Sequence, residues 1–329
     1  MAGRRHNRYS GIGGQAVLEG VMMKNKEKYA VAVRRPDGGI SVEVNNYPGV
    51  LCGRRIKDIP FIRGIFNFID SLILGTRCLN FSASFYEEEE GDGSKKGGMG
   101  DRLMTTLVTC FSVLLAVGIF IVLPYFLAAQ LNGFLRNKSL TAIIEGVLRI
   151  VIFILYIWGI SAMKDIRRLY RYHGAEHKCI NCIEKGRPLT PANAMRSSRL
   201  HRRCGTSFIF FVFFISIILF FFIRVENPLW RVGLRILLMP VVAGISYEII
   251  RLAGRSDNIL VRLISAPGMA IQRMSTKEPD RQMVEVAIAS VEAVFNWRAY
   301  LMENFGYTEE ELQPEEKWSE SDSEEQDDI

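Results

Sequence analysis

Histidine is scarce in this 329-residue sequence, which holds four histidines and six cysteines. The opening residues, MAGRRHNRYSGIGG, lack the apolar core of a secretory signal peptide. We therefore expect a reducing compartment, in which the cysteines are free thiols or metal ligands. No GK[ST] triplet follows the glycines at 11–14, so they predict a tight backbone path rather than a phosphate-binding loop. These absences argue against a secreted, disulfide-rich protein and against a P-loop nucleotide enzyme.

Acidic residues are few in the body of the chain because they gather at its end. Residues 309–329 carry eleven acidic side chains and one basic one. Without that segment the chain has 40 basic and 24 acidic residues, a net charge of +16 compared with +6 for the whole. A basic body of this kind predicts binding to nucleic acid or to an anionic membrane surface.

Long apolar runs decide between these two partners. A helix needs about 20 apolar residues to cross a bilayer, and four stretches suit this length: 105–127, 141–163, 206–223 and 232–250. Buried helices of a soluble protein are the alternative, but residues 206–223 carry no charge at all. We therefore expect the lipid bilayer and its anionic headgroups as partners, with another membrane protein as a candidate partner. We expect no specific nucleic-acid partner.

The positive charges of the short loops predict the orientation in the membrane. Segment 164–204 has eleven basic and three acidic residues, whereas loops 128–140 and 224–231 have two basic residues each. Basic loops stay on the cytosolic side. We therefore predict that 164–204 is cytosolic and, with four spans, that both termini are cytosolic as well.

Outside the spans, the pattern predicts a small β unit and amphipathic helices. Residues 29–33 and 40–44 flank a Pro-Asp-Gly turn and predict a hairpin, with 10–24 as a further extended segment. Glu19 is predicted to lie on that strand, and an edge position facing water is the simplest account of it. Apolar residues recur at helical spacing over 60–75, which favours a helix in the membrane interface over a buried helix of a soluble domain.

The C-terminal part is predicted to hold two cytosolic helical segments and a tail. Residues 258–274 are apolar and basic with a break at Pro267-Gly268, and 281–305 predict one amphipathic helix. The fold class is therefore mainly α: a polytopic helical membrane protein with about four transmembrane helices, a small N-terminal β unit and cytosolic amphipathic helices. The predicted segments are a cytosolic β unit at 1–55, an interfacial helix at 56–86, a flexible charged linker at 87–102, a transmembrane domain at 103–255 with a His/Cys loop at 164–205, interfacial and cytosolic helices at 256–308, and a disordered acidic tail at 309–329.

The stretch RYHGAEHKCINC at 171–182 concentrates metal-binding residue types. Residues 164–178, which follow the second span, contain no proline, so we expect its helix to continue into this stretch. His173 and His177 then lie on one helical face, four residues apart, a spacing that suits two imidazoles on one zinc ion. HGAEH also matches the H-x-x-E-H zincin pattern, in which Glu176 would be the general base. Cys179 and Cys182 form a C-x-x-C just downstream.

A second group, His201 and Cys204 in LHRRCGTSF, stands just before the third span. If the second and third spans are neighbours, this group returns to HGAEH. A closed structural site would need four ligands, and an open catalytic site three. The structural sets are His173, His177, His201 and Cys204, or a set that includes Cys179 and Cys182; the catalytic set is His173 and His177 with His201, Glu184 or Glu248. Glu248 equally suits an ion pair with Arg251, and metal-free packing of the cluster is a further alternative.

Four motifs together resemble the YqhQ family over about residues 10–305: GGQAVLEGVMMK at 13–24, YHGAEHKCINC at 172–182, HRRCGTSF at 201–208 and IQRMSTKEPD at 271–280. Its members are uncharacterised bacterial multi-pass membrane proteins that share a domain of unknown function, often labelled as predicted metal-dependent enzymes. The resemblance implies a location in the bacterial cell membrane but no substrate. It supports seven site residues: His173, Glu176, His177, Cys179, Cys182, His201 and Cys204.

These observations predict a cytosolic site for zinc or another divalent transition metal, since mixed nitrogen and sulfur ligands favour zinc. Our first hypothesis is a metal-dependent hydrolase at the membrane surface, with Glu176 as the proton acceptor. The alternative is a non-enzymatic scaffold or membrane-protein biogenesis factor in which zinc joins the second and third spans. A third hypothesis is a transporter that uses intramembrane charges; of these, we expect Glu145, Arg149 and Arg235 to pair with one another.

Overall fold

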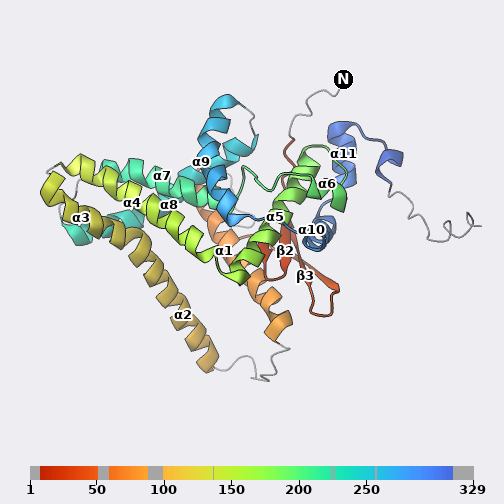
Figure 1. Ribbon diagram of the computed structural model, residues 1–329, viewed down its shortest axis with the longest axis horizontal. Helices are drawn as coiled ribbons and strands as arrows, with labels where there is room; N and C mark the ends of the chain where they lie inside the picture. Colours follow the sequence, from red (N-terminus) through yellow and green to blue (C-terminus); the bar gives the residue numbers. More distant parts are fainter. Residues whose placement is uncertain are drawn as a thin grey trace, which may run out of the picture.

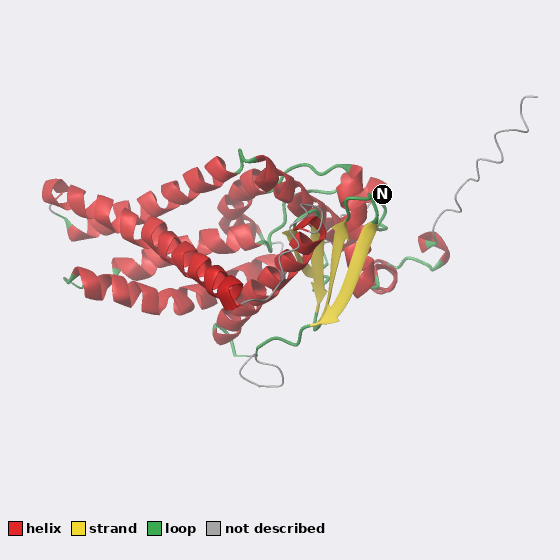
Figure 2. Cartoon of the chain, turned by 90° about the horizontal axis from the view of Figure 1, so that it is seen from below, coloured by secondary structure: helices red, strands yellow, loops and turns green. Residues whose placement is uncertain are grey.

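The computed structural model describes residues 8–50, 59–87, 99–135, 137–223, 225, 227–255 and 258–313. Most of the predicted linker, at 88–98, and most of the predicted acidic tail, at 314–329, lie outside the described residues. A sheet-containing unit occupies one end of the molecule and long apolar helices extend from it (Figures 1 and 2). The prediction of a mainly helical protein with an N-terminal β unit is confirmed.

Four antiparallel strands form the N-terminal sheet in the order β1-β2-β3-β4. Their bounds are β1 Gly13–Val17, β2 Gly20–Asn25, β3 Lys28–Arg34 and β4 Ile40–Asn46. The predicted hairpin is confirmed as β3 and β4, and the predicted extended segment forms β1 and β2. The predicted position of Glu19 on a strand is wrong. Glu19 lies in the turn between β1 and β2, with φ of 49°.

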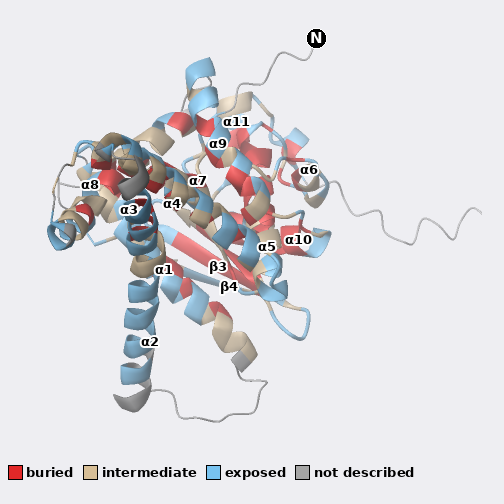
Figure 3. Ribbon diagram, turned by 60° about the vertical axis from the view of Figure 1, so that its left-hand side comes forward, coloured by how far each residue is buried: buried red, intermediate tan, exposed pale blue. Residues whose placement is uncertain are grey.

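Helices cover both faces of the sheet because successive strand residues point to opposite sides. Helix α1 (Ile62–Glu87) packs with Leu74 and Cys78 against the face that carries Val31 and Val33. Helices α5 (Lys164–Glu184) and α10 (Arg281–Val294) cover the other face, where Ala30 and Ala32 belong to their core. The buried colours of Figure 3 gather in this layered unit. The sheet therefore gives α5 a rigid support.

Three of the described helical stretches are long and apolar enough to cross a membrane: Thr106–Leu131, Ser139–Ile160 and Leu229–Gly254. The helices that contain them are α2 Met99–Val117, a π-helical turn at Gly118–Val122, α3 Leu123–Leu135, α4 Lys138–Ile160 and α8 Pro228–Arg255. Three of the four predicted spans are matched in this way. The fourth falls on α7 (Gly205–Phe221), whose 17 residues form a shorter apolar helix between α4, α8 and α9.

Helix α2 diverges from the other long apolar helices (Figures 1 and 3). Its side chains at 103–104 and 106–116 are exposed, an arrangement that suits a helix in contact with lipid. By contrast, charged side chains inside the bundle are paired. Glu145 accepts hydrogen bonds from Arg149 at 3.0 Å and from Arg235 at 2.8 Å, and all three residues are buried. The predicted pairing of these intramembrane charges is confirmed.

The structure corrects three predictions about where helices break, and the first concerns the end of the second predicted span. Helix α4 ends at Ile160 and α5 begins at Lys164, so the second span does not run on unbroken into HGAEH. The last carbonyls of α4 are satisfied by tight backbone bonds from Ser161 and Met163, which close the helix. The new direction of α5 carries it away from the bundle and onto the sheet (Figure 1).

Helix α9 (Ile259–Ser275) is continuous, although Pro267 lies inside it. Gly268, the residue after Pro267, packs directly against Ser207 of α7. This tertiary contact supports the helix on the far side of the proline. The predicted single helix at 281–305 is instead two helices, α10 and α11 (Trp297–Phe305). Asn296 separates them because its side chain caps the backbone N–H of Ala299. The remaining helical segments are α6 Pro191–Met195 and a 3₁₀ turn at Glu310–Leu312.

Candidate metal centre

His173, His177 and Cys204 converge at the junction of α5 and α7. One possible ligand atom of each residue lies within 4.8 Å of those of the other two. The Cys204 Sγ is 3.3 Å from His173 Nε2, and the two imidazole ring centres are 4.4 Å apart. His177 is 1% exposed and Cys204 is 5% exposed, whereas His173 is half-buried. The group is therefore largely enclosed, and His173 is its most exposed member.

Backbone carbonyls fix the orientation of both imidazoles. His173 Nδ1 lies 3.0 Å from the carbonyl oxygen of Ser275, and His177 Nδ1 lies 2.7 Å from that of Arg199. A carbonyl oxygen only accepts, so each Nδ1 carries the hydrogen and donates it. Each Nε2 then keeps its lone pair for a metal, as in protein zinc sites whose histidines donate their other N–H to an outer oxygen.

Gly174 allows this arrangement. A side-chain carbon at position 174 would overlap the carbonyl oxygen of Lys277, well inside van der Waals contact. The missing side chain lets segment 275–277 lie directly on α5, where the Lys277 N–H donates to the Tyr170 carbonyl at 2.9 Å. This contact places the Ser275 carbonyl beside His173.

Glu176 is buried between the donor group and the sheet. One of its carboxylate oxygens, Oε2, has no hydrogen-bond partner among the described residues. Burial raises the pKa of Glu176 to about 7, although the neighbouring His173 and a hydrogen bond from the Gly14 backbone act in the opposite direction. Its position one residue before His177 and one turn after His173 follows directly from H-x-x-E-H. This is the kind of carboxyl group that exchanges a proton near neutral pH.

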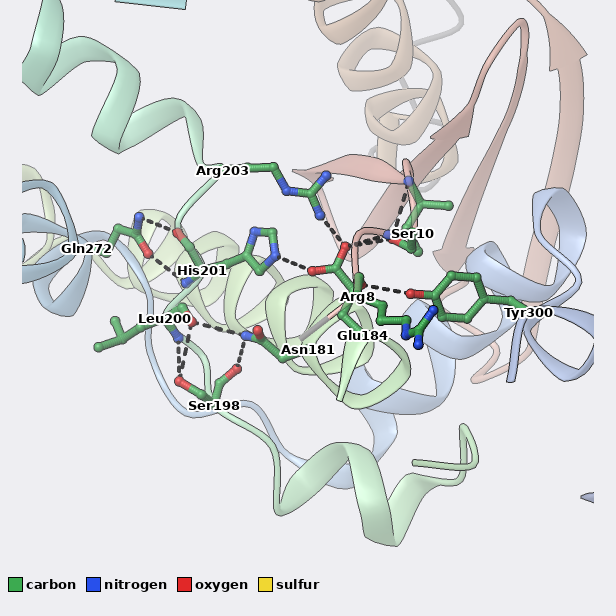
Figure 4. A network of polar contacts seen from close by, with 11 residues as sticks. Arg8, Ser10, Asn181, Glu184, Ser198, Leu200, His201, Arg203, Gln272 and Tyr300 are labelled. Carbon is green, nitrogen blue, oxygen red and sulfur yellow. Dashed lines mark hydrogen bonds and ion pairs between the residues drawn. The ribbon is translucent and has the colours of Figure 1, made fainter. Parts of the chain in front are cut away.

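His201 and Glu184, two further predicted ligands, interact with each other instead (Figure 4). His201 Nε2 lies 3.2 Å from Glu184 Oε2, and the other carboxylate oxygen accepts from Arg203 and from the Ser10 backbone and hydroxyl. Burial alone would raise the pKa of Glu184, but the His201 hydrogen bond and the charges of His201 and Arg203 lower it to about 2. The His201 ring centre is 5.7 Å from that of His177, so His201 borders the donor group without completing it.

The remaining candidates lie elsewhere. Cys179 and Cys182 are buried in the core between α5, the sheet and α10, and Cys182 Sγ donates to the Pro188 carbonyl at 3.4 Å. Burial raises the pKa of both thiols, that of Cys182 to about 11, which keeps them protonated at neutral pH. Glu248 forms an ion pair with Arg63 and lies 4.0 Å from Arg251. Cys179, Cys182 and Glu248 therefore contact other residues and do not belong to the donor group.

The donor set fits a divalent transition metal. Two imidazole nitrogens and one thiolate are the mixed ligands that zinc accepts, and three protein ligands leave one tetrahedral position for water or substrate. Sequence reasoning identified these three residues but gave no role to Ser275 and Arg199, whose carbonyls orient the rings. Ser275 lies in IQRMSTKEPD at 271–280, one of the four motifs, so the sequence contained a signal for it. Arg199 lies in none of these motifs, and nothing in the sequence marked it.

The fold and the donor group define a class: a mainly helical protein with three candidate membrane spans and a sheet-supported His₂Cys group that could hold a metal ion. Residues 59–297 match the family model described as "Protein of unknown function (DUF1385)". The chain is 36% identical over 312 residues to the uncharacterized protein YqhQ of Bacillus subtilis (strain 168), a match that covers 91% of this chain and 97% of that relative. The chain therefore belongs to the DUF1385 family, and the resemblance to YqhQ proteins is confirmed. No solved structure matches it.

Proposed function

We propose that the protein is a zinc-dependent hydrolase that acts at the cytosolic surface of the bacterial cell membrane. His173, His177 and Cys204 hold the ion, and Glu176 accepts a proton from the attacking water. The proposal includes four spans, with α7 as the third, and a cytosolic location for 164–204 and both termini. The excess of basic residues in 164–204 supports this orientation.

One observation carries the proposal: a three-ligand donor group stands next to a buried carboxylate with an unpaired oxygen. A structural zinc site closes four protein ligands around the ion, whereas a catalytic site has three and an open position. A bound zinc ion supplies a Lewis acid that makes water a stronger acid. Glu176 then needs only to take and return a proton, and its burial against Gly14 keeps it in place for that role.

The steps assigned to this chain are few. The Ser275 and Arg199 carbonyls keep both Nε2 atoms directed at the ion, so no ring rotation is needed before the reaction. The enclosed walls around His177 and Cys204 exclude bulk water, which strengthens every electrostatic interaction in the site. Substrate enters on the His173 side, where the group is half-buried.

A scaffold in which zinc joins two helices is the second candidate. The observation that favours it is the position of the ligands, because two lie on α5 and the third immediately precedes α7. A zinc ion at this place would clamp the extramembrane unit to the bundle. The transporter hypothesis has no comparable support, because Glu145, Arg149 and Arg235 are already paired with one another.

Glu176→Gln distinguishes hydrolase from scaffold, because it removes the base and retains the shape of the side chain. In cells that lack the native gene, we expect the variant to fail to restore the pool of small molecules and lipids measured by mass spectrometry, while the purified variant keeps its zinc and its Tm within a few degrees. Full restoration by Glu176→Gln would support the scaffold. Gln15→Asn, a change on the adjacent strand β1, is the control for variation in expression.

A further inference from the structure

A large cavity lies where α5 ends and where α8 passes into α9. Its volume is about 1210 Å³, and its walls come from the last turn of α5, the loop at 198–203 and the facing ends of α8 and α9. The loop is held to α5 by Asn181, whose side-chain amide donates to the carbonyls of Ser198 at 2.7 Å and Leu200 at 3.0 Å (Figure 4). The three metal-ligand candidates do not line this cavity. It is a second site.

The polar wall of the cavity has an excess of positive charge. Its basic lining residues are Lys185, Arg187, Arg202, Arg203 and Arg262, and Glu184 is the one acidic residue among the described lining residues. Glu184 already accepts hydrogen bonds from Arg203 and Ser10. Lys185, Arg187 and Arg262 are exposed, so their charges are available to a ligand. A concave site with several unneutralised cations attracts a phosphate or another anion.

The apolar part of the lining belongs to α9, the helix that also carries Arg262, and this helix has an exposed apolar face. Ile259 and Leu263 line the cavity and are 78% and 71% exposed, and Leu260 beside them is 63% exposed. Together these side chains present a hydrophobic surface at the point where a membrane-spanning stretch, Leu229–Gly254, has just ended. An amphipathic helix of this kind lies in the headgroup region with its apolar side in the acyl boundary.

We propose that this cavity binds the headgroup of an anionic phospholipid. The phosphodiester contacts Arg187 and Arg262, and the acyl chains run along Ile259 and Leu263. A free phosphate compound fits the cationic wall alone, and a neutral lipid fits the apolar wall alone. Only an anionic amphiphile carries both a negative charge and an apolar part. An anionic phospholipid is therefore the ligand that contacts both the basic and the apolar lining residues. This inference does not depend on the proposed hydrolysis.

The test uses the full-length protein in detergent, titrated with dioleoyl phosphatidylglycerol or dioleoyl phosphatidylcholine and examined by native mass spectrometry. We expect phosphatidylglycerol to bind more tightly than phosphatidylcholine. The double variant Arg187→Gln, Arg262→Gln is expected to lose about tenfold in phosphatidylglycerol affinity, in line with the attraction that each basic side chain exerts on an anionic membrane. The matched control is Arg196→Gln, Arg281→Gln, which removes two arginines outside the cavity and should bind like the native protein.

Two further arms identify the source of the phosphate and the role of the apolar wall. sn-Glycerol 3-phosphate, which has the anionic group without acyl chains, is expected to bind far more weakly than phosphatidylglycerol. Ile259→Ser, Leu263→Ser is expected to weaken phosphatidylglycerol binding and to leave glycerol phosphate binding unchanged. Equal losses in the cavity and control double variants would overturn the proposal, as would glycerol phosphate binding as tightly as the lipid. Both arginines are exposed, so the variants should retain the native Tm without lipid.

Discussion

The sulfur of Cys204 lies 3.3 Å from Nε2 of His173, although 31 residues separate the two along the chain. The α5 helix and the residue that precedes α7 supply these atoms, so the donor group exists only when the sheet-containing unit and the apolar helices are correctly joined. The first prediction concerns this joint.

Cys204→Ser is expected to reduce the zinc content of the purified protein by at least about tenfold, because the hydroxyl is a much weaker zinc ligand than a thiolate. Elemental analysis after dialysis gives the zinc-to-protein ratio. Cys182→Ser is the matched control, since Cys182 is also a buried thiol but bonds to the Pro188 carbonyl. Equal zinc in the native protein and the Cys204 variant would remove Cys204 from the site.

Gly174→Ala is expected to destabilise the sheet-containing unit by about 1–3 kcal/mol, the usual cost of inserting atoms into a packed contact. The added methyl group would displace the Lys277 carbonyl and, with it, the segment that orients His173. Zinc affinity should therefore fall together with Tm. Gly159→Ala is the comparison, because a side-chain carbon at position 159 would meet no other part of the described chain within 4 Å and alanine favours the helix there.

Glu184 is expected to make stability depend on acid. Its pKa in the folded protein is about 2, below the ordinary value of 4.5, so its interactions stabilise the fold above pH 4.5. A shift of this size is worth about 3 kcal/mol, which is lost as the pH falls from about 4.5 towards 2. Glu184→Gln should lower Tm at pH 7 and flatten the dependence of Tm on pH between 5 and 3. An unchanged acid dependence in this variant would contradict the assignment.

Glu145→Gln is expected to cost about 3–5 kcal/mol, because it leaves the buried guanidinium groups of Arg149 and Arg235 without their carboxylate. Thermal inactivation in detergent and the yield of folded protein measure this cost. The double variant Glu145→Gln, Arg235→Gln should recover part of the loss, because one uncompensated charge is removed. A double variant less stable than the Glu145 variant alone would show that the two side chains do not act as a pair.

Much of the membrane architecture could be predicted from the sequence because bilayer length and hydropathy constrain it directly. Pro-Asp-Gly between alternating apolar residues was enough to predict the hairpin of β3 and β4. The break at Ser161–Met163 was not predicted, because Gly159 is the one weak stop signal near it and the packing of α5 on the sheet sets the new direction of the chain. Similarly, Pro267 suggested a break that contact between Gly268 and Ser207 prevents.

The donor group was predictable in part. The spacing of His173 and His177 is a local property of a helix, and it required no knowledge of tertiary structure. His201 and Cys204 were equally good candidates in the sequence, because both lie in the same short segment. Their side-chain directions depend on how Asn181 and Gln272 hold the backbone of that segment, and such contacts have no signature in one sequence.

The outer partners of both histidines are main-chain oxygens, and this has a consequence for how the family diversifies. A point substitution at 199 or 275 changes a side chain but keeps a carbonyl group at that position. Ser275 is buried with its hydroxyl 3.0 Å from that of Thr206, and Arg199 forms an ion pair with Glu278, so the carbonyl stays in place only if the new side chain fits these neighbours. The alignment of the imidazoles therefore depends on the path of the main chain, and residues of other types at 199 and 275 can maintain it.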